Sequence, residues 1–269
     1  TRIPLVRERI EQWFSIEPNL SQHPDEAVAL GAAIQAGILS GQVRNVILVD
    51  VTPLSLGIET FGGLMNVIIP RNSTIPVKAG ELFTNAVNNQ ESIAIRVLQG
   101  EREMARDNWL LGEVEVSFEP GPKGSARVGV QFTIDQDGIL EVLTRDTATG
   151  EDHVLKIQAA VDVDDQRVEQ MVSESIDHAF DDMNERIWTE AKLKSEELLP
   201  AVESALALVG GQLESEEREL ITSKAQAVQQ LLDSGLRDAP QLKGANQALD
   251  EVTQNLAALL VEKAFDQQP

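Results

Sequence analysis

The segment Val46–Ile58 reads VILVDVTPLSLGI and decides how this chain is divided. Four consecutive apolar side chains, three of them β-branched, are followed by Asp50 and then by Thr52-Pro53. Proline has no backbone N–H and restricts the residue before it, so neither one long helix nor one central strand can continue through this point. Two interpretations remain: a short buried strand, or an apolar linker that docks in one state of the protein and is exposed in another. The sequence on either side has to decide between them.

The composition permits a folded core and indicates a reducing compartment. The chain has 269 residues, of which 42% are hydrophobic, and it contains no cysteine. Disulfides, thiolate chemistry and Cys-ligated metals are therefore excluded, and a cytoplasmic location is expected. No run reaches the ~18 apolar residues that a membrane-spanning helix needs. A start at Thr1, with neither Met nor a signal peptide, is expected of a piece of a longer protein.

The negative charge is concentrated toward the C-terminus. The net charge is −22, and residues 160–269 hold 23 acidic against 9 basic side chains. A negative field of this size repels phosphate backbones and anionic lipid head groups, so we expect no nucleic acid and no membrane as partner. An acidic, solubilising helical surface explains most of this charge, which by itself indicates no function.

Two helices are predicted before the apolar segment, over Leu5–Phe14 and from about Asp25 to Gly41. The second follows His23-Pro24, and proline with early acids suits the amino end of a helix. Two such helices cannot enclose a core by themselves. We expect them to belong to a larger domain.

From about Pro53 to Ile157 the apolar residues recur with a period of two, which is typical of strands. The alternation is clear over Ile93–Val97 and again over Val128–Ile134. Asp137-Gly138 separates the latter run from Ile139–Val142 and is a strong hairpin signal. Short strands at this spacing predict an antiparallel β-sandwich.

After Asp162 the period becomes helical. One long helix is predicted from Asp164 to a point before Pro200. Three shorter helices are predicted near Ala201–Leu208, Ser215–Asp233 and Gln241–Phe265, with Gly-rich or Pro-containing connections. Together they are interpreted as a small helical bundle.

Several motifs follow one another in a characteristic order: Thr1-Arg2-Ile3-Pro4, Pro24–Ala33, Val46–Thr60, Asn72–Pro76, Asn89-Gln90, Val97–Arg102 and Asp137–Leu140. In this order, and in its sequence of linker, sandwich and helices, the chain resembles the C-terminal part of the seventy-kilodalton heat-shock chaperones of the bacterial DnaK type. The resemblance covers nearly the whole chain and is densest up to Leu140.

The resemblance implies an α+β multidomain protein. An antiparallel β-sandwich would be followed by a helical lid and preceded by a short helical fragment of an actin-like ATPase domain. The implied divisions are residues 1–41 for the ATPase-domain fragment, 42–52 for the interdomain linker with Val46, Ile47, Leu48, Val49 and Asp50, 53–160 for the substrate-binding sandwich, and 161–269 for the lid.

The implied function is that of a molecular chaperone in protein folding and the stress response. It would bind short extended hydrophobic segments of unfolded or nascent polypeptide clients, with an affinity gated by ATP in the full-length protein. The parent would be an ATPase that uses ATP and Mg²⁺ together with a J-domain co-chaperone and a nucleotide exchange factor. This fragment is expected to be no enzyme and to hold no cofactor or metal. Self-association through a linker or lid in another protomer's channel is a further expectation.

The resemblance also assigns the channel that would hold the client. Ile93 would form the bottom of a central pocket, and Phe61 and Ala86 would arch over the client backbone. On pattern alone, Phe83, Ile93 and Ile95 would instead be ordinary sandwich core. The complete implied set is Ile58, Thr60, Phe61, Phe83, Thr84, Ala86, Gln90, Ile93, Ile95 and Val128.

A latch between lid and sandwich is implied at Lys123 and Asp182. A Lys–Asp pair is less directional than a bidentate Arg pair, so this latch is expected to be weak.

One alternative class of function stays open, and another is disfavoured. The chain could be a structural adaptor that binds a folded partner through its acidic helices, in which case binding would depend strongly on salt. An enzyme is disfavoured because His23, His153 and His178 are scattered over different elements without ligand spacing, and neither a phosphate-binding loop motif nor a nucleophile elbow is present.

Overall fold

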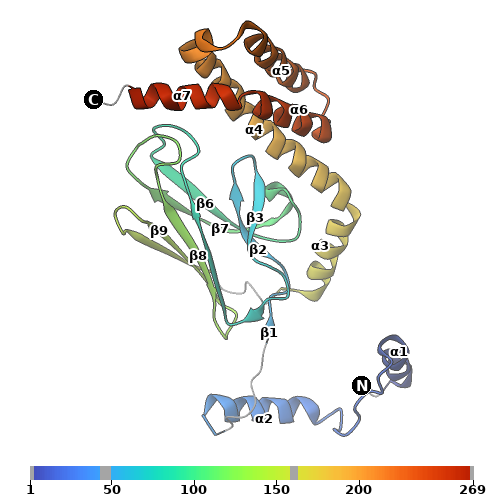
Figure 1. Cartoon of the computed structure of the whole chain (residues 1–269). Coiled ribbons are helices and arrows are strands. Elements are labelled where there is room, and N and C mark those ends of the chain that lie inside the picture. The colour runs from blue at the N-terminus through green and yellow to red at the C-terminus, as the bar shows by residue number, and fades with distance from the viewer. Residues whose placement is uncertain (1–2, 43–49, 158–162, 267–269) are drawn as a thin grey trace. The chain divides into compact units, whose positions relative to one another are not determined.

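The computed structural model describes residues 3–42, 50–157 and 163–266, and the chain separates into two units after Asp50. The first unit contains helices α1 (Pro4–Phe14) and α2 (Ala27–Leu39), close to the two predicted helices (Figure 1). Helix α2 is apolar around most of its circumference yet exposes Val28 and Ile34. A helix of that kind is usually buried in a larger domain. The assignment of residues 1–41 to an ATPase domain stays a prediction.

The second unit contains a β-sandwich of two four-stranded antiparallel sheets. One sheet has the order β3-β2-β6-β7 and the other β10-β9-β8-β5, and β1 pairs with β4 (Figure 1). The strands are β1 (Asp50–Val51), β2 (Leu56–Thr60), β3 (Leu64–Ile69), β4 (Thr74–Ile75), β5 (Val77–Phe83), β6 (Ser92–Gln99), β7 (Trp109–Ser117), β8 (Val128–Ile134), β9 (Leu140–Asp146) and β10 (Asp152–Ile157).

The inner faces of the two sheets form one hydrophobic core. Along β8 every second residue is buried, and Phe132 at its centre is fully enclosed. The predicted hairpin is confirmed, because β8 and β9 pair in antiparallel register across a turn in which Gly138 has φ +76°. That left-handed conformation is easily reached only by glycine. Period-two alternation thus places the large aliphatic side chains between the sheets.

Strand β6 buries side chains on both of its faces near its end. A register shift between Val97 and Leu98 interrupts its pairing with β7. Val97 packs in the main core, whereas Leu98 joins a small separate cluster with Met65 and Ala105. Ala105 belongs to the 3₁₀ turn η1 (Ala105–Asp107), which covers this part of the sheet's outer face. The sandwich therefore offers a second, covered face at this end.

The C-terminal helices differ from the sequence-based prediction at two points. The predicted single helix up to Pro200 is wrong: it breaks at His178 and continues beyond the proline. The predicted last helix is also divided, at Thr253. The observed elements are α3 (Asp165–Asp177), α4 (Ala179–Val209), the 3₁₀ turn η2 (Gly210–Gln212), α5 (Ser215–Asp233), α6 (Ala239–Val252) and α7 (Gln254–Asp266).

Packing explains why α4 passes through Pro200. The missing N–H removes one helical hydrogen bond, which disfavours proline inside a helix. Beyond it, however, Val202, Ala205 and Val209 are buried against residues of α5, α6 and α7 in the core of the bundle. Ser195 and Asn246, both buried, also join α4 to α6 by a 2.8 Å hydrogen bond. These contacts on both sides of Pro200 outweigh one lost hydrogen bond.

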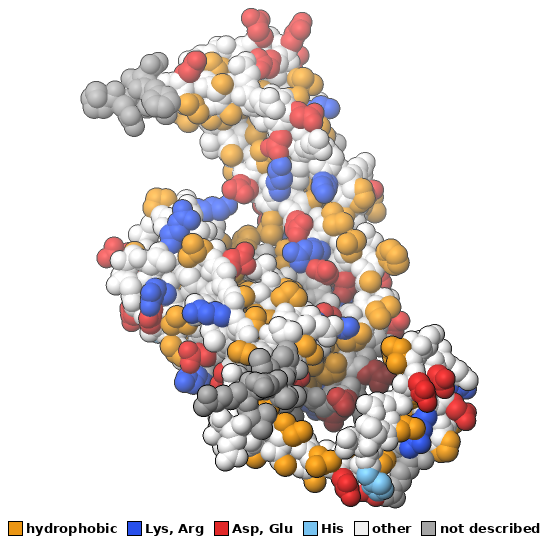
Figure 2. All heavy atoms as spheres, turned by 60° about the horizontal axis from the view of Figure 1, so that its bottom comes forward, with side chains coloured by type: hydrophobic (Ala, Val, Ile, Leu, Met, Phe, Trp, Pro, Cys, Tyr) orange, Lys and Arg blue, Asp and Glu red, His pale blue; other side chains and the backbone are white. Residues whose placement is uncertain are grey.

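The surface of the helices carries both acidic and basic side chains. Acidic side chains lie over the exposed face of the helices with Lys and Arg between them (Figure 2), and Arg186–Glu190 and Lys192–Glu196 are i,i+4 pairs on α4. Within the part of the chain that the structure describes, no helix is both long enough and apolar enough to cross a bilayer.

Candidate functional site

The core of the sandwich ends in two incompletely covered side chains. Ile95 and Val128 are fully buried members of the core, while Phe83 and Ile93 pack against it and stay partly exposed. Phe83 is the last residue of β5 and lies opposite Val128, and Ile93 lies near the start of β6. Because β5 and β6 belong to different sheets, each sheet contributes one partly exposed side chain to this end of the core, which we call the open end. Ile58 of β2 is fully buried in the same core.

The segment 84–91 crosses between the sheets at this open end and is held by side-chain hydrogen bonds. Gln90 Oε1 accepts a bond of 2.8 Å from Ala86 N–H, and its amide nitrogen donates to Ser92 C=O at 2.7 Å. Ala86 is thereby presented in a fixed loop, while the neighbouring Thr84 is exposed. Gln90 thus supports the loop, whatever else it binds.

Asn85 is the structural centre of this loop, and sequence reasoning missed it. It is almost fully buried; its amide nitrogen donates to Pro122 C=O at 2.8 Å, and its Oδ1 accepts from Ala126 N–H at 3.0 Å. These bonds tie segment 84–91 to the neighbouring loop 120–126. A buried Asn with satisfied donors and acceptors rigidifies its surroundings. Nothing in the local pattern distinguishes Asn85 from an ordinary loop residue.

The turn between β2 and β3 presents the other predicted arch residue. Phe61 is 62% exposed, and Thr60 Oγ donates to Leu64 C=O at 3.2 Å across the turn. Gly62 and Gly63 both have positive φ, +88° and +74°. Phe61 and Ala86 thus lie on two separate turns, each held by its own local bonds.

Helix α4 lies directly against this turn. A Cβ added to Gly62 would approach Leu193 Cδ1 and Thr189 Cγ2 to 2.9 Å, which is closer than ordinary contact. Helix α3 makes a similar contact further along, where a Cβ on Gly100 would lie 2.8 Å from Met171 Cε. Two glycines of the sandwich therefore permit the close approach of helices α3 and α4.

The strongest polar contact between the helices and the sandwich is Arg102–Asp182. The Arg102 guanidinium binds the carboxylate in bidentate fashion, with Nη2 to Oδ1 at 2.8 Å, and both side chains are largely buried. The Arg102 hydrogen bonds hold the pKa of Asp182 below its ordinary value, although burial opposes this shift. Asp182 also raises the pKa of Arg102. The pair is thus charged over the whole neutral range.

The predicted Lys123–Asp182 latch is wrong in its pairing. Asp182 is occupied by Arg102, and Lys123 Nζ instead binds Glu197 at 3.0 Å, further along α4. Bidentate geometry and burial favour Arg for Asp182. Lys123 therefore remains a contact between the sandwich and α4, with a different acidic partner.

Three further arginines bind acidic side chains at or beside this boundary. Arg186 of α4 donates to Glu103 at 2.8 Å and to Met65 C=O at 3.1 Å. Arg106 of η1 binds Glu185 of α4. Arg237, in the connection between α5 and α6, binds the other oxygen of Glu185 at 3.5 Å. Glu185 therefore links the sandwich, α4 and the bundle.

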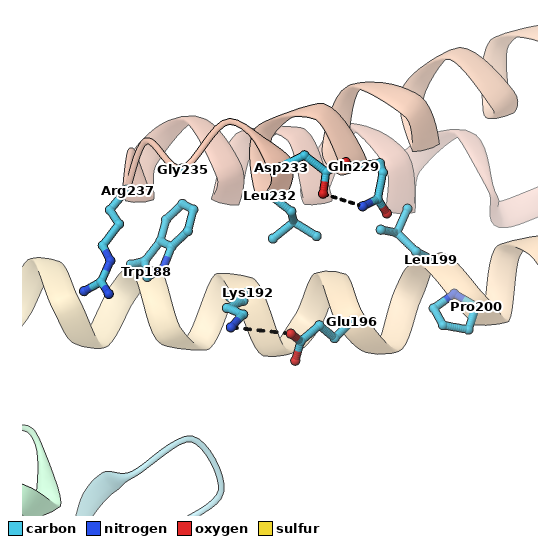
Figure 3. Close-up of a pocket in the computed structure, with 10 residues that line it drawn as sticks. All are labelled: Trp188, Lys192, Glu196, Leu199, Pro200, Gln229, Leu232, Asp233, Gly235 and Arg237. Atoms are coloured by element: carbon cyan, nitrogen blue, oxygen red, sulfur yellow. Dashed lines mark hydrogen bonds and ion pairs between the residues drawn. The ribbon is translucent and has the colours of Figure 1, made fainter.

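A groove runs along α4 on its bundle side (Figure 3), with a volume of about 640 Å³. We call it the lid groove; α4 contributes Trp188, Lys192, Glu196 and Leu199, and α5 contributes Gln229 and Leu232. A smaller hollow of about 200 Å³ lies between α4 and the turn at Gly62. Both are lined by Trp188, Lys192, Glu196 and Arg237, so the two hollows lie on either side of the same side chains.

Other sequence-based expectations meet the structure only in part. The linker residues Val46, Ile47, Leu48 and Val49 lie outside the described residues, and Asp50 is exposed in β1. His23, His153 and His178 lie on separate elements, and among residues 3–42, 50–157 and 163–266 no three His, Cys, Asp or Glu side chains are grouped to hold a metal ion.

A comparison with family models agrees with the architecture. The model of the Hsp70 protein family matches residues 1–262. The α+β architecture of an antiparallel sandwich with a C-terminal helical bundle is consistent with that match. Full-length members of this family are ATP-dependent chaperones that bind unfolded clients and co-chaperones. The chain belongs to the Hsp70 family.

Proposed function

We propose that this chain is the C-terminal part of a DnaK-type Hsp70 and that its sandwich binds short extended hydrophobic segments of unfolded polypeptides. The observation that carries the proposal is the open end of the core, where Ile93 and Phe83 are only partly covered. The turns that carry Phe61 and Ala86 are each held by side-chain hydrogen bonds. In the proposed complex these two residues lie over the client backbone. Ile58, Thr60, Thr84, Gln90, Ile95 and Val128 complete the proposed channel.

This kind of binding suits a chaperone because the affinity for a client depends little on the amino-acid sequence of that client. Main-chain hydrogen bonds to an extended strand are the same for every sequence, while one apolar pocket selects for Leu-like side chains. Burial of one such side chain contributes about 1.5–3 kcal/mol. This gain is modest, so slow release has to come from the helices that lie over the sandwich.

Substitution of Ile93 tests the proposed pocket. Ile93→Phe fills it, and because burial of one client side chain is lost, the Kd of a Leu-rich peptide should rise about 10- to 100-fold. Fluorescence anisotropy with a labelled peptide measures the change. Val154→Phe is the matched control, because Val154 lies on β10 and is 52% exposed, away from the pocket. Equal peptide affinities of the Ile93→Phe variant and the wild type would overturn the channel.

The adaptor alternative is separated by the same assay. An adaptor that used the acidic helices would bind a folded basic partner, with an affinity that falls steeply with salt. A Leu-rich unstructured peptide bound through an apolar pocket should keep most of its affinity when salt is raised. Failure of such peptides to bind at any salt concentration would favour the adaptor.

The nucleotide step belongs to the parent protein in this proposal. Full-length Hsp70 proteins use ATP and Mg²⁺, but the described residues 3–42 provide two helices and no group of acidic side chains that fits a metal ion. A J-domain co-chaperone and a nucleotide exchange factor are proposed partners of the parent only.

The apolar segment would couple the two parts. We propose that Val46–Val49 dock on the ATPase domain in the ATP state, with Asp50 at the edge. In the full-length protein, Ile47→Asp or Leu48→Asp places a charge in that contact, which is strongly unfavourable unless the charge is paired. ATP should then no longer accelerate peptide release. Unchanged acceleration would remove the linker assignment while leaving the channel untouched.

A further inference from the structure

We propose that the lid groove is a second binding site for the same client, taking a bulky apolar side chain of the polypeptide just outside the segment held in the sandwich. This inference rests on the proposed function. It starts from the four side chains that the groove shares with the hollow beside Gly62, the residue that follows the exposed Phe61. A chain that leaves the sandwich past this turn meets Lys192 and Glu196 next and then the groove itself.

The floor of the groove suits a large apolar side chain. Trp188, Leu199 and Leu232 converge on it from α4 and α5 (Figure 3), and all three are only partly buried by the bundle core. Aromatic side chains such as Trp188 bury a large apolar area and commonly anchor a binding partner. Their remaining exposed surface is what an apolar client side chain would cover.

The rim of the groove suits an extended main chain. Lys192–Glu196 and Gln229–Asp233 pairs border it, at 3.6 Å and 3.0 Å, and offer both donors and acceptors. Pro200 also lines it and cannot donate the helical hydrogen bond to Glu196 C=O, which leaves this carbonyl without its helical donor. Every N–H and C=O of an extended segment needs such partners when it leaves water.

The size of the groove suits one or two apolar side chains. A volume of about 640 Å³ falls within the range of small-ligand sites. A second segment of an already bound client also gains from its high effective concentration, so even weak contacts contribute.

The groove stays next to the Gly62 turn of the sandwich only while the helices lie against the sandwich. Arg237 lines the groove and binds Glu185, which is held in turn by Arg106 of the sandwich. Opening of the lid would separate the two hollows and with them the two halves of the client site. Client contacts in the groove would therefore also favour the closed arrangement.

Paired peptides test this inference on the chain Thr1–Pro269. One peptide carries only a Leu-rich core, and the other carries the same core, a Gly/Ser spacer and one Trp, with spacers of increasing length on either end of the core. We expect the best extended peptide to bind the wild type about tenfold more tightly than the core peptide, the gain from burying most of one large side chain.

Two matched variants test whether the tighter binding of the extended peptide arises in the lid groove. Gln229→Trp fills the groove and should reduce the advantage of the extended peptide to nothing, while leaving the affinity for the core peptide unchanged. Gln230→Trp makes the same change at the neighbouring exposed position, which does not line the groove, and should keep the advantage. Circular dichroism melts show whether both variants keep a folded bundle.

The outcomes separate this inference from the proposed function. If core and extended peptides bind the wild type equally at every spacer length, the lid groove is no client site, although the channel stands. If the advantage survives Gln229→Trp, the extension binds elsewhere and the inference is also overturned. If the core peptide does not bind at all, the proposed function fails, and the inference fails with it.

Discussion

The sandwich and the helical bundle are each held by an apolar core, but the boundary between them is held mainly by charge. The sandwich encloses Phe132 and the bundle encloses Leu242 without any exposed surface. Across the boundary, apolar contacts include those of Met171 with Gly100 and of Leu193 with Gly62. The polar contacts are more prominent: Arg102–Asp182, Arg106–Glu185, Arg186–Glu103 and Lys123–Glu197.

This difference shows how one chain can be stable and yet open. Apolar cores gain free energy from burial and depend little on direction. The ion pairs between sandwich and helices form only when the two parts are in contact. When the parts separate, water solvates the charged groups. If the helices separate from the sandwich, as the proposed function requires, these ion pairs break and neither core has to unfold. A closure of this kind is suited to repeated opening.

The largest effects should come from breaking one core at a time. Phe132→Ala should lower the free energy of unfolding of the sandwich by about 3–5 kcal/mol, and Leu242→Ala that of the bundle by about 2–5 kcal/mol. Urea titration followed by tryptophan fluorescence separates the two, because Trp109 lies in the sandwich and Trp188 in the lid. Each substitution should move mainly the transition of its own part.

Single-tryptophan variants make this measurement unambiguous. Trp13→Phe removes the third tryptophan, which is exposed in the first unit, and Trp109→Phe or Trp188→Phe leaves one reporter. Equal shifts of both reporters in both core variants would mean that sandwich and bundle unfold as one unit. The comparison between two separate cores would then be wrong.

The next largest effect should come from the buried ion pair. Arg102→Ala leaves the carboxylate of Asp182 without its partner, and Asp182→Asn removes the charge; each should weaken the seating of the lid by about 2–3 kcal/mol. Because the chain has no cysteine, Asp137→Cys and Gln230→Cys can carry a unique pair of fluorophores on sandwich and lid. Energy transfer between them should fall in both variants.

The same pair predicts a pH dependence with a definite sign. The pKa of Asp182 is lower with the lid seated than its ordinary value of 3.8. Its contribution is therefore complete above the ordinary value and is lost as the pH falls through the lowered one. Energy transfer in the wild type should decrease only in that acidic range, and Asp182→Asn should abolish this step. A lid that opens near neutral pH would have to depend on another group.

Sequence reasoning succeeded where a local pattern determines the structure. Period-two alternation and Asp137-Gly138 predicted β8, β9 and their hairpin because strand pairing between neighbours depends on nearby residues. It failed at Pro200, because the propensity of proline was outweighed by packing of residues distant in sequence. It also missed the break after Asp177, where no glycine or proline marks the end of a helix.

The candidate site divides in the same way. Residues such as Ile93 and Phe83 lie at the end of strands, so a motif match could place them. The partner of Asp182 could not be predicted, because Arg102 is separated from it by 80 positions and several acidic and basic residues compete. Asn85 was missed because burial of a loop side chain depends on the neighbouring loop.

A smaller effect is expected where the lid meets the β2–β3 turn. Gly62→Ala adds a methyl group 2.9 Å from Leu193 and Thr189, and Ala at φ +88° is strained by about 1–2 kcal/mol. Gly63→Ala carries the same kind of strain at φ +74°, but its nearest neighbour is 3.9 Å away. Only Gly62→Ala should lower the energy transfer between lid and sandwich. Equal effects of both substitutions would attribute the change to backbone strain alone.

The smallest effect should belong to Lys123–Glu197, although it spans the same boundary. Both side chains are at least half exposed, at 50% and 68%, and exposed pairs contribute about 1 kcal/mol or less. Lys123→Ala should therefore accelerate peptide release only a few-fold, and salt should accelerate release less in the variant than in the wild type, because the other ion pairs of the boundary remain. Lys156→Ala is the matched control, because its exposed pair with Glu141 lies within the sandwich and is similar in length at 3.2 Å. If Lys123→Ala opened the lid as far as Arg102→Ala does, burial would not be what makes one ion pair strong and the other weak.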